Sequence, residues 1–401
     1  MTSLASADIR RHNLALVATR LAEVGTASRS DLADATGLAR GSVTALVRQL
    51  EADGLVRETA LVAAEGKGRP RTMLELSGDH LAILTLLIDA DHASAVASTL
   101  GGERLTRVER RHGRPMGDPA RVLDIAAEAF DAALGELGDR EVADASVVVW
   151  APVGGDPAVV LADTDLGWGT VDLVALLADR SPRFAALASA GRVRLLADTQ
   201  VAALAEHAAA GRPSELVYLK SDSGIGGAVV VDGTPVDGSH HLAGALGHLP
   251  VVPGGVRCEC GQHGCLVTVA GPDVLLERAG LAELARDEGL TVALDEFVRR
   301  IRAGEPAAVD AWDAGAAELA RTLQIVTLTV DPAIIVVGGY LAALADDLGE
   351  RLAKIQPGLE GAFLTAPQVV GSRLGRDAAL LGAEQTAVAR LLADPAALSP
   401  A

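Results

Sequence analysis

The most specific run in this 401-residue sequence reads Cys258-Glu259-Cys260-Gly261-Gln262-His263-Gly264-Cys265. It holds all three cysteines of the chain, and His248 lies ten residues before it. Three thiolates and one imidazole form a closed tetrahedral ligand set that suits Zn²⁺. The two glycines permit the tight turns that such close spacing requires. The sequence therefore predicts one zinc ion per chain with a structural role, bound by His248, Cys258, Cys260 and Cys265.

Three alternatives to this ligand set are weaker. His263 is a rival fourth ligand, but its place inside the tight loop favours an outward-facing side chain. A disulfide with one free thiol is disfavoured in a reducing cytoplasm. Chance clustering of inert cysteines does not fit well when all three lie within eight residues. We therefore prefer a metal site completed by His248.

The sequence on both sides of this run alternates between short apolar strands and helices. Buried strands are predicted at 81–88, 146–150, 216–219, 228–231 and 334–339. A long helix is predicted around 305–330, and a glycine-rich turn at 223–227. This alternation is typical of an α/β unit, here of two lobes with a cleft between them.

The N-terminal part follows a different pattern. Apolar residues at helical spacing predict helices over 9–24, 30–37 and about 40–53, with a tight turn between the last two. This is the helix-turn-helix pattern of DNA-binding proteins. One face of the third helix is apolar and would be buried. The opposite face would meet bases and phosphates, and it carries Arg40, Gly41, Ser42, Thr44 and Arg48.

A basic loop follows the third helix. Strand character at 55–57 and 72–76 frames the glycine-rich segment 65–71. Two strands joined in this way form a wing, and its Lys67, Arg69 and Arg71 would approach a narrow minor groove. The alternative is a docking or dimerisation module built from the same elements. The basic loop and the polar face of the third helix favour DNA.

Charge is divided unevenly along the chain. The net charge is −18, yet residues 1–72 carry ten basic and eight acidic side chains. The rest carries 25 basic and 45 acidic side chains and would repel phosphates, so DNA contacts must come from the N-terminal part. We find no secretory signal and no apolar run long enough for a membrane span. We therefore expect a cytoplasmic protein without membrane contact.

These motifs together resemble the ROK family, whose name stands for repressors, open reading frames and kinases. The resemblance is carried by the N-terminal helices, the alternating body, and the run Ala243-Gly244-Ala245-Leu246-Gly247-His248 with the cysteine loop. It extends from about residue 9 to 393. Within the family, the chain resembles the regulators related to the xylose repressor and to the N-acetylglucosamine and glucose regulators.

The resemblance implies an α/β fold with a winged helix-turn-helix domain over 1–77 and an actin-like, hexokinase-like domain over 78–401. The first lobe would span about 78–196 and include a C-terminal helix at about 377–393. The second lobe, with the zinc loop, would span about 197–376. Double-stranded operator DNA is the implied partner, bound by a homodimer or a dimer of dimers.

The first phosphate-binding motif of the family's kinases is changed in this chain. The kinases have Asp-x-Gly-Gly-Thr, where this sequence reads Asp89-Ala90-Asp91-His92-Ala93. Both glycines that let backbone amides approach phosphates are absent, and Asp91 adds a negative charge. The second phosphate loop, at 223–227, keeps its glycines, which a hairpin turn also explains. Since phosphoryl transfer depends on positioning and charge neutralisation, we expect no enzymatic activity.

The sugar contacts that the family implies are also reduced. The Asn-Asp pair of the kinases is Ala197-Asp198 here, and Ala245 and Val267 replace two glutamates. Each lost hydrogen bond to a charged group costs about 1.5–3 kcal/mol, so ordinary hexoses should bind weakly. Asp198 and His248 are left as candidate ligand contacts. Asp198 has an alternative role as the N-cap of the helix over 199–210.

The resulting hypothesis is a DNA-binding transcriptional regulator, a repressor of carbohydrate-related or secondary-metabolism genes, with a degenerate sugar-kinase-like effector domain. A small-molecule effector, where one exists, is expected to differ from an ordinary hexose. One alternative is a zinc-containing ROK sugar kinase with an extra DNA-binding domain, against which the 89–93 loop argues. Another is an interaction scaffold that has lost ligand binding.

Overall fold

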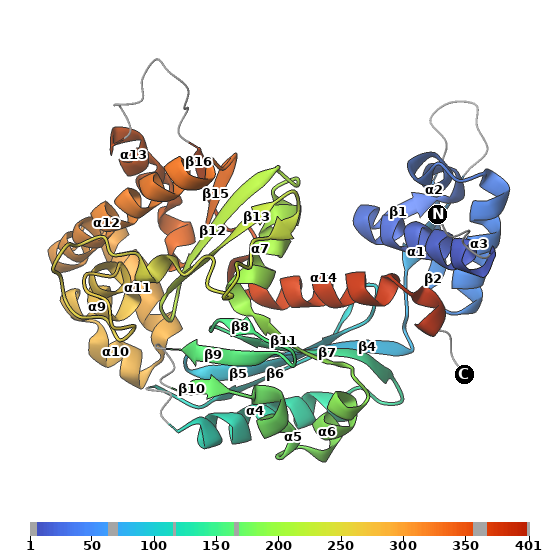
Figure 1. Ribbon diagram of the computed structural model, residues 1–401, viewed down its shortest axis with the longest axis horizontal. Coiled ribbons are helices and arrows are strands. Elements are labelled where there is room, and N and C mark those ends of the chain that lie inside the picture. The colour runs from blue at the N-terminus through green and yellow to red at the C-terminus, as the bar shows by residue number, and fades with distance from the viewer. Residues whose placement is uncertain (1–5, 63–70, 115–117, 164–167, 356–366, 399–401) are drawn as a thin grey trace.

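The computed structural model describes residues 6–62, 71–114, 118–163, 168–355 and 367–398. The chain forms a small N-terminal head and two larger lobes, which lie at the right, the bottom and the upper left of Figure 1. The α/β class and the winged helix-turn-helix arrangement predicted from the sequence are both confirmed.

The head combines three helices with a small antiparallel sheet. Its elements are α1 (Ser6–Val24), β1 (Thr26–Ser28), α2 (Arg29–Thr36), α3 (Arg40–Ala52), β2 (Val56–Val62) and β3 (Arg71–Leu76). The strands lie in the order β1-β3-β2. Ser28 and Asp31 form a capping box at the start of α2, and Gly37 ends this helix in the left-handed region. Aliphatic residues of all three helices form the core of the head.

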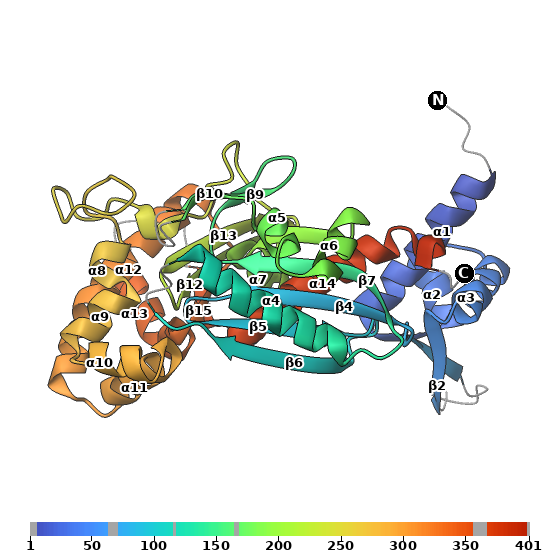
Figure 2. The ribbon, with the colours of Figure 1, turned by 90° about the horizontal axis from the view of Figure 1, so that it is seen from below.

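The first lobe is built on a five-stranded sheet. Its strands are β4 (Leu81–Ile88), β5 (His92–Ser98), β6 (Arg104–Arg111), β7 (Glu141–Val149) and β11 (Val193–Ala197). A smaller sheet contains β8 (Val153–Gly154), β9 (Val159–Asp163) and β10 (Gly169–Val171). The helices are α4 (Pro119–Gly135), α5 (Leu173–Ala178) and α6 (Pro182–Ser189). Figure 2 shows α4 lying across one face of the large sheet, where its apolar side buries against β4 and β5.

The second lobe contains another five-stranded sheet. Its strands are β12 (Glu215–Ser221), β13 (Ile225–Val231), β14 (Thr234–Pro235), β15 (Ile334–Gly339) and β16 (Gln368–Gly371). In each lobe, three neighbouring strands are parallel, and two further strands, each antiparallel to the strand before it, complete one side. The orders are β11-β7-β4-β5-β6 and β16-β15-β12-β13-β14. The two lobes therefore share one sheet topology, which is the architecture that the actin-like hypothesis requires.

Helices surround the sheet of the second lobe. They are α7 (Asp198–Ala209), α8 (Val267–Ala270), α9 (Pro272–Arg278), α10 (Ala282–Asp287), α11 (Leu290–Arg302), α12 (Pro306–Val330) and α13 (Ala345–Ile355). Short 3-10 turns occur at 246–248, 340–344, 375–377 and 395–398. Within the described residues, no helix combines the length and hydropathy that a membrane span requires.

The helix α14 (Ala378–Leu392) joins the three parts of the molecule. It packs along α7 between the lobes and contacts β4 and β7 of the first sheet. Its far end reaches the head, as Figure 1 shows, and Ala387 and Leu392 belong to the same apolar core as the head helices. The carboxylate of Asp144 on β7 accepts hydrogen bonds from Arg390 at 2.7 Å and holds this end of α14 in place.

Candidate metal centre, DNA-binding face and ligand cleft

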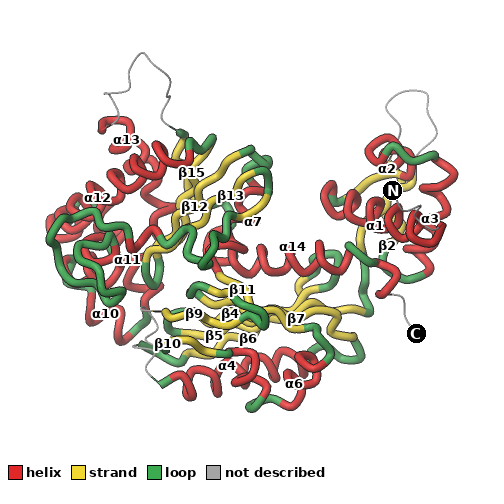
Figure 3. The backbone as a smooth tube through the Cα atoms, in the orientation of Figure 1, coloured by secondary structure: helices red, strands yellow, loops and turns green. Residues whose placement is uncertain are grey.

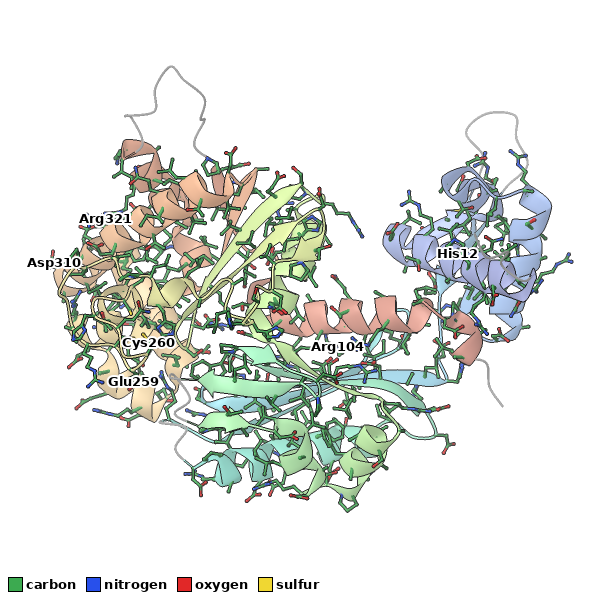
Figure 4. All side chains as sticks on the ribbon, viewed as in Figure 1. His12, Arg104, Glu259, Cys260, Asp310 and Arg321 are labelled. Carbon is green, nitrogen blue, oxygen red and sulfur yellow. The ribbon has the colours of Figure 1, made fainter. Side chains whose placement is uncertain are left out.

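The predicted metal ligands converge in one loop of the second lobe. Figure 3 shows the segment between β14 and α8 as a long irregular loop, and Figure 4 marks Cys260 within it. The ligand atoms of His248, Cys258, Cys260 and Cys265 all lie within 4.8 Å of one another. His248 Nδ1 is 3.6 Å from Cys258 Sγ, and Cys260 Sγ is 3.6 Å from Cys265 Sγ. These separations match the edges of a tetrahedral zinc site with sulfur and nitrogen ligands.

Backbone conformation brings these ligands together. Gly264 has a φ of 72°, and a Cβ at this position would lie 1.7 Å from the carbonyl oxygen of Val252. The amide of Cys258 donates to the carbonyl of Gln262 at 2.8 Å, which closes the turn. His263 is exposed and lies outside the ligand cluster, as the sequence led us to expect.

The chemistry of the four groups fits a metal ion. Burial and the neighbouring thiols raise the pKa of Cys265 to about 12, and burial also raises the pKa of Cys258. Without a cation, these thiols would keep their protons in a tight polar cluster. A metal ion that displaces the protons converts the same cluster into a compensated set of ligands. The Cys₃His cluster is thus able to hold a metal.

The predicted DNA-binding face of α3 is open to solvent. Arg40, Gly41, Ser42 and Arg48 are exposed, while Thr44 is half-buried and donates to the carbonyl of Arg40 at 2.8 Å. The opposite face is formed by Val43, Leu46, Val47 and Leu50, all of which are buried in the head. The polar face therefore has no role in packing the head.

The predicted wing is only partly visible. Lys67 and Arg69 lie outside the described residues. Arg71 is the first residue of β3, and its guanidinium forms an ion pair with Asp31 of α2 at 3.0 Å. An intramolecular partner therefore competes with any phosphate for Arg71.

A cavity of about 600 Å³ lies in the cleft between the two lobes. Trp150 and Pro152 line it from the first lobe, and Asp198, Lys220 and His248 line it from the second. His241 packs so closely on the first lobe that a Cβ at Gly154 would lie 2.2 Å from its ring. Because His248 and Cys260 also line this cavity, the metal centre and the cleft share a wall.

An ion-pair cluster, which we call the Asp198–Lys220–Asp222 cluster, forms the polar side of the cavity. Lys220 Nζ lies 3.1 Å from Asp198 Oδ2 and 3.2 Å from Asp222 Oδ2. Burial raises the pKa of both carboxyl groups. Burial alone would lower the pKa of Lys220, but the two carboxylates hold it well above its ordinary value.

The structure excludes one of the two roles considered for Asp198, that of helix N-cap. The N-cap of α7 is Ala197, and Asp198 is the first residue of the helix, without a capping hydrogen bond. The N-cap alternative is therefore wrong, because the Asp198 carboxylate is instead held by Lys220 and by the amide of Thr199 at 2.7 Å. Sequence reasoning missed Lys220 and Asp222. The sequence shows only Lys220 near the end of a largely apolar strand and Asp222 just after it, which does not reveal their pairing with Asp198.

Only two of the three positions at which sugar contacts are substituted lie at the cavity. Ala197 and Ala245 line it and offer no hydrogen-bonding side chain. Val267 begins α8 and is not among the residues that line the cavity. The loss of polar contacts in the cleft thus concerns two of the three positions.

The altered phosphate loop makes a contact across the lobes. Asp91 is buried, and its Oδ2 accepts a hydrogen bond at 3.2 Å from the amide of Leu290, the first residue of α11. Its other oxygen lies 2.7 Å from His92 Nδ1, and this hydrogen bond lowers the pKa of Asp91. Gly289 is required beside it, since its φ is 105° and a Cβ there would lie 2.9 Å from the carboxylate. The carboxylate thus occupies a helix N-terminus that could otherwise attract a phosphate.

Comparison with protein families agrees with this architecture. The model of the ROK family matches residues 89–390. The chain belongs to the ROK family. A winged helix-turn-helix DNA-binding model matches residues 21–57 of this ROK protein.

Two relatives of this ROK protein represent the two branches of the family. One is the DNA-binding transcriptional repressor Mlc of Escherichia coli, 26% identical over 352 residues, which are 85% of this chain and 84% of the repressor. The other is the kanosamine kinase of Amycolatopsis mediterranei, 36% identical over 191 residues. That match spans 48% of this chain and 59% of the kinase. The repressor match therefore extends over far more of the chain.

Solved structures show the same fold. A ROK family transcriptional regulator, described as a homologue of the Escherichia coli Mlc protein, aligns with a TM-score of 0.71 and 23% identity. The alignment covers 96% of this chain and 97% of that one. A ROK family glucokinase from Streptomyces griseus, in complex with glucose and AMPPNP, aligns with a TM-score of 0.60 and 21% identity over 76% of this chain.

Proposed function

We propose that this ROK protein is a DNA-binding transcriptional regulator, acting as a repressor, whose body responds to a small-molecule signal. The observation that carries this proposal is a winged helix-turn-helix head with an exposed Arg40–Arg48 face, joined to a ROK body in one continuous chain. The repressor Mlc is similar over 85% of the chain, which supports the same interpretation. Such a protein acts in the cytoplasm, where its operator DNA lies.

In this proposal, residues 1–77 form the DNA-binding domain. Residues 78–401 form the domain that senses the small molecule and forms the homodimer or dimer of dimers. The recognition surface is formed by Arg40, Gly41, Ser42, Thr44 and Arg48, with Lys67, Arg69 and Arg71 as wing contacts. A homodimer or a dimer of dimers would place two heads on paired half-sites, because one recognition helix buries too little surface for tight specific binding.

We propose a structural zinc ion at the Cys₃His cluster. Its ligands would be His248, Cys258, Cys260 and Cys265, and all four positions of a tetrahedral ion would be filled by protein. The ion would fix the loop that forms one wall of the cleft. With no position open for water, it would contribute stability and no catalytic chemistry.

The body is proposed to lack kinase activity. The carboxylate of Asp198, the position of the kinases' catalytic base, is paired with Lys220 at 3.1 Å. Such a pairing opposes proton abstraction, because a general base must be free to accept the proton of a hydroxyl group. Asp91 also places a carboxylate on the N-terminus of α11, in the loop that would hold phosphates. We expect no ADP release above background in a coupled assay with ATP and a panel of hexoses; sugar-dependent turnover would instead establish the kinase alternative.

The first test of the regulator concerns α3. Operator fragments would be selected from genomic DNA with the full-length protein, and affinity would be measured by fluorescence anisotropy. We expect Arg40→Ala and Arg48→Ala each to weaken binding about tenfold, since a base or phosphate contact contributes about 1–3 kcal/mol. Arg321→Ala makes the same change on the body, where Figure 4 places Arg321 far from the head, and should bind as the parent does. Unchanged affinity in both α3 variants would contradict the proposed interface.

A further inference from the structure

A hydrogen-bonded pair of side chains links α1 to the proposed recognition helix α3. The guanidinium of Arg10 on α1 donates to Gln49 Oε1 on α3, through Nη2 at 2.7 Å and through Nε at 3.2 Å. The two residues are 39 positions apart in the sequence, and they meet because α1 packs on α3 in the head (Figure 1). Arg10 is exposed and Gln49 is half-buried, and neither belongs to the apolar core of the head. The pair is thus available for a role other than packing.

Gln49 lies in line with part of the proposed recognition surface. Residues seven apart in an α-helix lie almost on one line along its axis, so Gln49 and Ser42 share a side of α3. Ala45 lies between them at helical spacing and is exposed, as is the neighbouring Arg48. None of the buried residues of α3 belongs to this row. The row from Ser42 to Gln49 therefore adds a polar side chain to the face that would meet DNA.

The hydrogen bonds from Arg10 leave the side chain of Gln49 able to donate but not to accept. An amide oxygen has two lone pairs, and the two bonds from Arg10 use both of them. In the described part of the chain, Gln49 Nε2 has no hydrogen-bond partner. The guanidinium of Arg10 has donors only. The pair therefore presents N–H groups, and no free acceptor, to a partner molecule.

A pair of this kind distinguishes the two purines in the major groove. Guanine presents two acceptors there, N7 and O6, whereas adenine presents the acceptor N7 and the donor N6. An unconstrained glutamine recognises adenine with two hydrogen bonds, because its oxygen accepts from N6 while its nitrogen donates to N7. When Arg10 occupies the oxygen, this adenine contact is lost. Donation to guanine remains.

We propose that Arg10 is a positioning residue that makes Gln49 select guanine over adenine in each operator half-site. The inference rests on the proposed function, in which α3 is the recognition helix of a DNA-binding regulator. Arg10 acts through Gln49, and Gln49 makes the base contact. The pair lies outside the recognition residues that the sequence predicts on α3 and in the wing, and it extends base recognition toward the C-terminal half of α3.

The test compares the base preferences of the full-length parent protein and two variants. Duplexes would be selected from a random-sequence library, and affinities for guanine and adenine at the affected position would be measured by fluorescence anisotropy. We expect the parent to favour guanine about tenfold at one position of each half-site, and Gln49→Ala to reduce this preference to about twofold or less. In Arg10→Ala, the freed oxygen of Gln49 can accept from adenine N6, so adenine should bind at least as tightly as guanine.

Arg11→Ala is the matched control, because it removes the same charge from the next position of α1. The guanidinium of Arg11 pairs with Asp394 at 3.6 Å and not with α3, so this variant should keep the preference of the parent. Melting temperatures of all variants would show that the head remains folded.

Three results would overturn the proposal: an unchanged guanine preference in Gln49→Ala, an unchanged preference in Arg10→Ala, or a change of preference in Arg11→Ala as large as that in Arg10→Ala. A uniform loss of affinity without a change of preference overturns it as well, and would indicate that the pair contacts phosphates. Selection of one consensus by the parent and all variants rejects this inference alone. A parent protein that selects no sequence rejects the proposed function itself.

Discussion

At the scale of single residues, Cys260 gives the sharpest test of the metal centre. Its thiol lies 3.6 Å from that of Cys265, in a loop with little regular structure. In Cys260→Ser, a hydroxyl group replaces a thiolate ligand and should bind Zn²⁺ far more weakly. We expect zinc content below about half an equivalent per chain and a melting temperature lower by about 5 °C, because metal-binding energy is folding energy here.

The matched control for this residue lies in the same loop. His263 is exposed and outside the ligand cluster, so His263→Ala should keep one equivalent of zinc and the parent melting temperature. Metal analysis by mass spectrometry and calorimetric melting would measure both variants. A full equivalent of zinc in Cys260→Ser, or loss of zinc in His263→Ala, would contradict the ligand assignment.

The sequence predicts the ligands of the metal centre but not the charged residues Lys220 and Asp222 of the cleft. The metal ligands could be predicted because three of them lie within eight residues and their chemistry is distinctive. Lys220 and Asp222 could not, because their pairing with Asp198 arises only when β12 and the start of α7 meet in the folded chain. An N-cap role for Asp198 is a reasonable prediction from helix propensities, yet the ion pair with Lys220 takes up the carboxylate.

At the scale of elements, the contact between α7 and α14 depends on one glycine. A Cβ at Gly382 would lie 1.8 Å from the carbonyl oxygen of Val201. Gly382→Ala must therefore separate two packed helices, which costs about 1–3 kcal/mol and should lower the melting temperature. The direction of the change in melting temperature is informative, because replacing glycine by alanine in an unobstructed helix stabilises the protein by up to about 1 kcal/mol. The control is Gly135→Ala in α4. A Cβ at this position would have no neighbouring atom within 4 Å, so the variant should not lower the melting temperature. An unchanged or higher melting temperature for Gly382→Ala would show that the helices are not in close contact.

The elements predicted from the sequence are those with a strong apolar pattern. The strand β4 is buried along its whole length, and β15 is buried along most of it, so both appear as continuous apolar runs. The sequence does not predict β5 and β6, because β5 is rich in small residues and β6 alternates with arginine and glutamate. Both are recognisable as strands only through pairing with β4 and with each other.

At the scale of the whole molecule, the head and the body share an apolar core. Leu392, the last residue of α14, is 1% exposed and packs with head residues such as Leu14 and Leu21. The same helix runs along α7, whose first residue is Asp198 in the cleft. A change in the cleft that moves α7 therefore has a continuous packed route to the DNA-binding head, although α14 lies 180 residues from Asp198 in the sequence.

Leu392→Ala tests whether this junction fixes the head. Removing the side chain leaves a cavity at the junction and costs about 2–5 kcal/mol. We expect amide hydrogen exchange to accelerate in α1 and α14 and to stay unchanged in α11 and α12, since these two helices belong to a separate core. Operator affinity should also fall, because a head that moves freely places two recognition helices less accurately on paired half-sites.

The control variant is Leu328→Ala, at a position on α12 that is 55% exposed, and it should change neither hydrogen exchange nor operator affinity. Faster exchange throughout the second lobe would mean that the body, and not the junction, had been destabilised; unchanged exchange in α1 would show that the head is held without α14.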